Sequence, residues 1–126
     1  MASSSKYYFP AAVWLVFITG MSMVPKLQLP EFNVFATDKI GHFAAYGLLV
    51  WLILFGFWRH HGRIAGWKEC LIIVVGAALY GALMEWVQGN FIPGRIFGYD
   101  DMIANTLGAG LAWGTAILYS QFKFRI

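Results

Sequence analysis

The sequence predicts an all-α membrane protein, with four transmembrane helices in one bundle, and three observations lead to this fold class. Hydrophobic residues make up 60% of the 126 residues and charged residues only 12%, a composition outside the usual range of soluble domains. The apolar residues gather in four long runs separated by short polar segments. So little chain lies between the runs that we expect a single domain covering residues 1–126.

The four runs cover residues 7–24, 40–58, 70–87 and 102–120, and each holds 18 or 19 residues. A helix of that length spans roughly 27 Å, close to the thickness of the hydrocarbon core. Inside lipid the backbone polar groups must bond to one another, which favours helices. Because Lys6 precedes the first run, that run could instead be the core of a signal peptide. It is longer than such cores usually are, and we interpret it as a retained helix.

The distribution of basic residues predicts the orientation, because short cytoplasmic segments retain positive charge. Alternate loops carry six and three basic residues: Lys6, Arg59, Arg63, Lys68, Lys123 and Arg125 on one side, and Lys26, Lys39 and Arg95 on the other. We therefore expect a multi-pass protein of the inner (cytoplasmic) membrane with both termini in the cytoplasm. The basic residues flank the predicted spans, so we expect no binding of nucleic acid.

Small residues spaced four apart predict where helices approach closely. Ala77 with Gly81, and Gly110 with Gly114, have the spacing that lets transmembrane helices pack backbone to backbone. We expect these two pairs to lie at helix contacts.

Polar residues near the predicted spans gather at the outer ends of three helices. An ionisable side chain in a membrane is costly, so each is a candidate for function. Spacings of four residues place members of the set on common helix faces. The set is Asp38, Lys39, His42 and Tyr46 on the second helix, Glu85 and Gln88 on the third, Arg95 in the outer loop, and Asp101 and Asn105 on the fourth.

This ordered set, together with Gly94 before Arg95 and Gly108 after Asn105, resembles the VanZ-like family, which is named for a protein associated with teicoplanin resistance. The resemblance covers residues 38 to about 114. It implies a membrane protein of the cell envelope, with glycopeptide resistance in some members, but not an agreed reaction.

Three residues are candidates for catalysis: Glu85, His42 and Asp38. Glu85 lies inside an apolar run, where burial favours a protonated carboxyl able to exchange a proton. The alternative is a structural anchor paired with Arg95 or Lys39. His42 is a candidate general base, oriented by Asp38 one turn earlier. Alternatively, His42 only locks the helices together through hydrogen bonds.

The remaining residues are candidates for substrate binding. The planar guanidinium of Arg95 can hold a phosphate or carboxylate through two hydrogen bonds, although an ion pair with a nearby acid is equally consistent with the sequence. On the fourth helix, Asp101 and Asn105 could bind a ligand. A helix cap together with a polar interhelical bond would explain these two residues equally well. The other candidates are Gln88, Asp101, Asn105, Tyr46 and Lys39.

Metal binding and function complete the predictions. The acidic residues with His42 include suitable ligands for a divalent cation, but no closely spaced ligand motif is present, so we expect no metal site and no cofactor. We expect membrane lipids as partners, and an outer site that acts on or binds an anionic lipid-linked or cell-wall precursor. The alternative is a non-catalytic lipid-binding or structural membrane protein.

Overall fold

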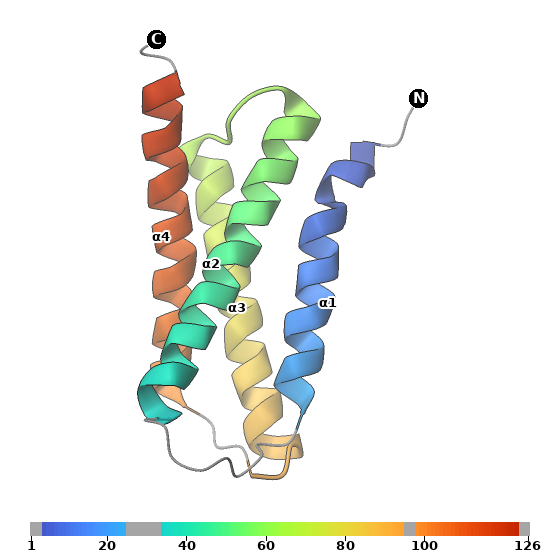
Figure 1. The fold of residues 1–126 in the computed structure, drawn as a ribbon, viewed down its shortest axis with the longest axis vertical. Helices are drawn as coiled ribbons and strands as arrows, with labels where there is room; N and C mark the ends of the chain where they lie inside the picture. Colours follow the sequence, from blue (N-terminus) through green and yellow to red (C-terminus); the bar gives the residue numbers. More distant parts are fainter. Residues whose placement is uncertain (1–3, 25–33, 95–97, 124–126) are drawn as a thin grey trace.

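The computed structural model is a bundle of long helices (Figure 1). It describes residues 4–24, 34–94 and 98–123, and this part contains no strand. A 3₁₀ turn at Ser4–Tyr8 leads into the first α-helix. The α-helices are α1 (Phe9–Met23), α2 (Val34–His61), α3 (Trp67–Phe91) and α4 (Tyr99–Lys123).

The last three predicted apolar runs lie within α2, α3 and α4, which extend beyond the runs at both ends. The first run begins in the 3₁₀ turn and ends one residue after α1. Hydropathy detects only the apolar stretch, whereas backbone hydrogen bonding continues through the polar residues on either side. The helix α2 stops at Gly62, whose φ is +69° and whose N–H donates to the carbonyl oxygen of Trp58 at 2.9 Å. Glycine adopts this left-handed conformation without the steric cost that other residues meet.

Two helical segments of the described chain, Lys39–His61 and Trp67–Phe91, are long and apolar enough to cross a membrane. The helix α1 has only 15 residues, and the apolar residues of α4 alternate with small and polar ones. The structure therefore confirms the all-helical class, while a bundle of four spans remains a proposal.

The helix α2 is central to the packing, since it lies along α4 and also contacts α1 and α3, while α3 packs against α4 and α1 (Figure 1). The core is formed by buried side chains from all four helices: Ile18, Tyr46, Leu49, Val50, Leu54, Cys70, Val74, Ala77, Ala109 and Ala112. Polar contacts help to attach α1. The indole N–H of Trp14 donates to the carbonyl oxygen of Ala45 at 2.8 Å, and the hydroxyl groups of Thr19 and Tyr80 form a hydrogen bond.

Glycines allow the close approach of α2 and α4. A Cβ atom added to Gly108 would overlap the carbonyl group of Phe43, and one added to Gly47 would lie 3.1 Å from the carbonyl oxygen of Gly108. The prediction for the pair Gly110 and Gly114 is wrong, because an added Cβ at either position meets nothing within 4 Å. Within the described part of the chain, neither glycine lies at a close helix contact.

The ends of the helices lie at two opposite ends of the bundle, which differ in the residues that they carry (Figure 1). The described ends of the chain and the turn between α2 and α3 lie at one end of the bundle. At this end Arg63 forms two hydrogen bonds with Glu69, at 2.9 and 2.5 Å. The opposite end holds the start of α2, the end of α3 and the start of α4, which carry the polar residues singled out in the sequence.

Candidate functional site

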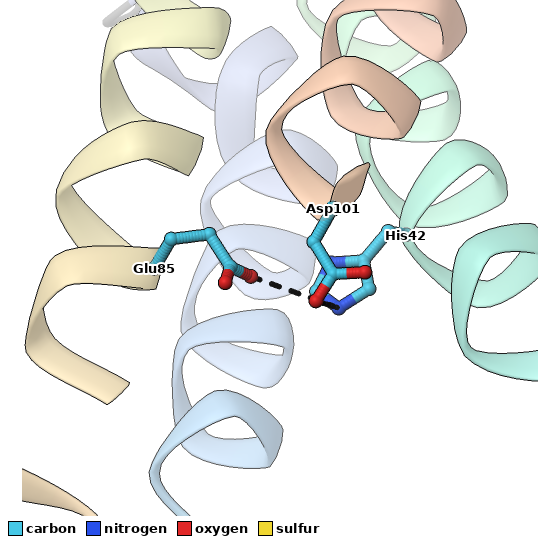
Figure 2. A group of neighbouring side chains, drawn as sticks. All are labelled: His42, Glu85 and Asp101. Atoms are coloured by element: carbon cyan, nitrogen blue, oxygen red, sulfur yellow. Dashed lines mark ion pairs between the residues drawn. The ribbon is translucent and has the colours of Figure 1, made fainter. Parts of the chain in front are cut away.

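Three side chains from three helices meet at this polar end, and we call them the acid–base cluster: His42 of α2, Glu85 of α3 and Asp101 of α4 (Figure 2). The Nε2 atom of His42 lies 3.9 Å from Oε1 of Glu85 and 3.7 Å from Oδ2 of Asp101. One ligand-type atom from each residue lies within 4.8 Å of the other two. The packing of α4 between α2 and α3 therefore brings together an imidazole and two carboxyl groups that are far apart in the sequence.

The cluster is closed on one side and open on the other. Glu85 is 1% exposed, whereas the side chains of His42 and Asp101 are 16% and 20% exposed. A buried carboxylate is costly unless it is paired, and Oε2 of Glu85 accepts a hydrogen bond from the backbone N–H of Gly98 at 3.3 Å. The arrangement keeps one acid away from solvent while two groups stay within reach of a substrate.

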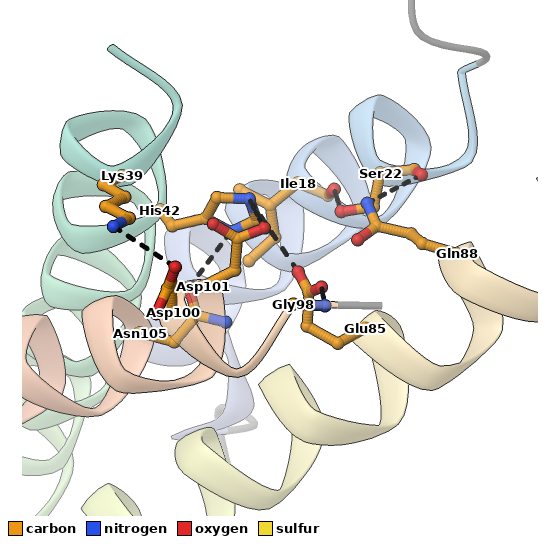
Figure 3. Close-up of polar contacts among 10 residues, drawn as sticks. All are labelled: Ile18, Ser22, Lys39, His42, Glu85, Gln88, Gly98, Asp100, Asp101 and Asn105. Carbon is orange, nitrogen blue, oxygen red and sulfur yellow. Dashed lines mark hydrogen bonds and ion pairs between the residues drawn. The ribbon is translucent and has the colours of Figure 1, made fainter. Parts of the chain in front are cut away.

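A hydrogen bond to Asn105 sets the orientation of the His42 ring (Figure 3). Nδ1 of His42 lies 3.1 Å from Oδ1 of Asn105, and because an amide oxygen only accepts, Nδ1 is the donor. The other ring nitrogen, Nε2, then faces the two carboxyl groups, where it can carry a proton or offer a lone pair. Asn105 is 1% exposed, so the interior of the bundle holds this partner in place.

Beside the cluster, Lys39 and Asp100 form a second ion pair, with 3.5 Å between Nζ and Oδ2 (Figure 3). Their side chains are 32% and 60% exposed, so the pair is easily exchanged for another charged partner. The pair borders a groove of about 320 Å³ between α2 and α4. Apolar side chains line the rest of the groove: Ile40, Phe43, Ile103, Ala104 and Leu107.

Two other predicted residues are buried near the cluster. The Nε2 group of Gln88 donates to the carbonyl oxygen of Ser22 at 3.0 Å, so it connects α3 to α1 (Figure 3). Tyr46 lies one turn after His42 and is 4% exposed. Its ring and Asn105 both lie against Gly81, where an added Cβ would be 3.2 Å from the Tyr46 ring.

Two candidates cannot be placed in the site. Arg95 lies outside the described residues, as does the side chain of Asp38, although Asp38 belongs to α2. Their predicted roles therefore stay predictions. The sequence analysis did not include Asp100 among the site residues, although a second acidic residue next to Asp101 already indicated that it could belong there. The backbone N–H of Gly98 has no sequence signal at all.

The fold and the site together define an all-helical protein that has helices able to cross a membrane and a largely buried acid–base cluster at one end of the bundle. The profile of one family, described as VanZ/LLP1, matches residues 3–120. The chain therefore belongs to the VanZ/LLP1 family, as the ordered polar residues suggested. Comparison with curated proteins and with solved structures gave no match.

Proposed function

We propose that this chain is a four-span protein of the cytoplasmic membrane whose acid–base cluster acts, at the outer face, on a lipid-linked envelope precursor with a phosphate headgroup. The observation that carries the proposal is the meeting of His42, Glu85 and Asp101 at the polar end of the bundle. A histidine between two carboxyl groups is suited to proton transfer when one side of the set is open to a substrate.

Exposed apolar side chains support four spans. Large apolar residues are exposed on all four helices, and Val16 of α1 and Ile72 of α3 reach 73% and 72% exposure. A soluble protein rarely exposes apolar surface on this scale, whereas lipid chains solvate it well. The helices α1 and α4 run beside α2 and α3, so a bilayer crossed by the latter pair would also surround the former (Figure 1).

The arrangement of the helix ends supports the orientation. Both described chain ends and the turn between α2 and α3 lie at the end of the bundle opposite the cluster (Figure 1). The six basic residues assigned to the cytoplasm belong to this end by sequence. The same orientation places the cluster at the outer face.

The groove beside the cluster supports a lipid with an anionic headgroup. Lys39 is able to exchange Asp100 for a phosphate oxygen, because their ion pair is partly solvated. Phe43, Ile103 and Leu107 offer apolar contact for the first part of a hydrocarbon chain. A lipid lying in this groove would bring its headgroup next to Asp101, which directly follows Asp100 in the sequence.

In this proposal His42 exchanges a proton with the headgroup, and Glu85 stabilises the charged imidazole. Glu85 is too deeply buried to meet the substrate directly, so it acts through His42. Asp101, which is more exposed, contacts the headgroup side of the cluster. Asn105 keeps Nε2 of the imidazole directed at both carboxyl groups.

The test is mass spectrometry of lipid extracted from the purified protein, with Glu85→Gln as the variant. Glutamine preserves shape and hydrogen bonding but exchanges no proton, so this variant should retain or accumulate the phosphate lipid that the wild type binds. Glu69→Gln makes the same change at the opposite end of α3 and should behave like the wild type. Lipid of bulk membrane composition from all three proteins would refute the proposal.

The teicoplanin resistance of a host that expresses the protein distinguishes catalysis from binding alone. Expressed in a teicoplanin-sensitive host, the wild type should raise resistance, as the family resemblance implies. The Glu85→Gln protein should retain lipid yet give no resistance if the cluster is catalytic. Resistance equal to that of the wild type would instead support the alternative, a non-catalytic lipid-binding protein.

A further inference from the structure

We propose that His42, Glu85 and Asp101 together bind a divalent metal ion, Zn²⁺ or Mn²⁺, and that this ion holds the phosphate of the lipid headgroup. The metal site is inferred from the geometry of the cluster alone. Its role toward phosphate rests on the lipid of the proposed function and takes the place of proton exchange by His42. With Nε2 of His42 bound to the ion, the ion contacts the headgroup, and Glu85→Gln would then release the lipid that a metal-free cluster retains. The sequence led us to expect no metal site because it contains no closely spaced ligand motif, and the proposal replaces that expectation.

The spacing of the three side chains fits an ion better than direct hydrogen bonds. The distances from Nε2 of His42 to Glu85 and Asp101, 3.9 and 3.7 Å, exceed the range of a hydrogen bond. Ligand atoms bound to one ion at about 2.0–2.2 Å in tetrahedral geometry lie roughly 3.3–3.6 Å apart. Small side-chain movements would therefore bring all three atoms to coordination distance.

Neighbouring groups already direct the ligand atoms. A metal-binding histidine usually donates its other ring N–H to a hydrogen-bond acceptor, and here Nδ1 of His42 donates to Asn105 at 3.1 Å. Glu85 is held in a similar way, because its Oε2 accepts a hydrogen bond from the backbone N–H of Gly98 while its Oε1 is the atom closer to His42. Each of these two ligands is held through one atom, while its other ligand atom faces the centre of the cluster (Figure 3).

Charge supplies a further reason, which depends on the proposed phosphate lipid. Two carboxylates beside a neutral imidazole would repel a phosphate, although the neighbouring groove suits a phosphate lipid. A divalent cation cancels the charge of the carboxylates and attracts the phosphate oxygens. Three protein ligands leave a coordination position for a substrate, as in catalytic rather than structural zinc sites. One imidazole and two carboxylates suit Zn²⁺ and Mn²⁺.

Metal binding is tested on the full chain in nanodiscs of phosphatidylcholine, treated with chelator and then dialysed against Zn²⁺ or Mn²⁺. We expect one ion bound per chain and at least tenfold weaker binding by His42→Ala and Asp101→Asn. Asp100→Asn is the matched control, because it removes the same charge at the adjacent residue, which forms an ion pair with Lys39. It should bind metal like the wild type. No stoichiometric binding by the wild type, or an equal loss in Asp100→Asn, would overturn the proposal.

A second measurement uses only the wild type and so does not depend on whether the variants fold. Pulsed electron paramagnetic resonance of bound Mn²⁺ should detect coupling to an imidazole nitrogen. A spectrum without nitrogen coupling would exclude His42 as a ligand.

The failure of this inference can be told apart from failure of the proposed function. Stoichiometric metal with no enriched phosphate lipid would support the metal site and refute the lipid proposal. An enriched phosphate lipid on a protein that binds no metal would leave the cluster as a metal-free proton-transfer site and refute the metal site.

Discussion

Replacing Gly108 with alanine is expected to force α2 and α4 apart. The added Cβ would overlap the carbonyl oxygen of Phe43 and lie 2.9 Å from the carbonyl carbon and 3.1 Å from the Cα atom. All three are backbone atoms, so no rotamer change relieves the contact. An ordinary contact begins at 3.4 Å, and the overlap with the carbonyl oxygen is the deepest of the three, so the helices must separate by about 1 Å or more at the crossing. Overpacking typically costs about 1–3 kcal/mol, and we expect a loss near 3 kcal/mol because the backbone itself must move.

The assay is reversible unfolding in mixed micelles, with the free energy of unfolding measured for the wild type, Gly108→Ala and Gly110→Ala. Gly110 is the matched control, since it lies on the same helix and an added Cβ meets nothing within 4 Å. Its variant should stay within about 0.5 kcal/mol of the wild type or gain stability from better helix propensity. The same separation would draw His42 away from Asn105, so lipid retention should fall in Gly108→Ala. Equal stability of the two variants would refute the reasoning about the crossing.

The other predictions concern the cluster, the orientation and the outer loop. Gly81→Ala should lower the free energy of unfolding by roughly 1–3 kcal/mol and reduce lipid retention, because its Cβ would lie 2.7 Å from the amide nitrogen of Asn105, which orients His42. Gly76→Ala adds its Cβ to open space and should leave the stability unchanged. A periplasm-active phosphatase fused at Ile126 should be inactive and one fused at Leu29 active; the reverse pattern would overturn the orientation. Arg95→Lys should reach normal membrane levels but lose most lipid retention if two hydrogen bonds hold the headgroup, and full retention would make Arg95 a structural ion-pair partner.

The helices themselves were predictable because the apolar runs are long and few charges interrupt them. The ends of the helices were harder to predict, since polar residues continue α2, α3 and α4 beyond their apolar parts. Small residues show why packing was harder to predict. Ala104, Gly108 and Ala112 are buried at spacings of four residues and form the packed face of α4. Gly110 is two residues, or about 200°, from Gly108, so the same small-residue pattern falls on the opposite face.

The polar end of the bundle was also predictable, but the membership of the cluster was not. Glu85 and Gln88 lie three residues apart and share a broad face of α3, yet Glu85 points to α2 and α4 while Gln88 bonds to α1. A rotation of about 60° between the two side chains is enough to give them different neighbours. How far each helix is rotated about its own axis depends on packing along the whole bundle, and the spacing of residues within one helix does not give that rotation.

By itself the sequence determined the helical class, the gathering of polar residues at one end of the helices and the likeness to the VanZ-like family. These properties depend on composition and order along the chain, since apolar runs demand helices in lipid and turns must lie between them. Only the tertiary structure decided that His42, Glu85 and Asp101 meet while Gln88 serves α1. The physical reason is that α2, α3 and α4 each bring one residue to the cluster, so its composition depends on how closely α2 and α4 approach at Gly108 and how each helix is turned about its axis.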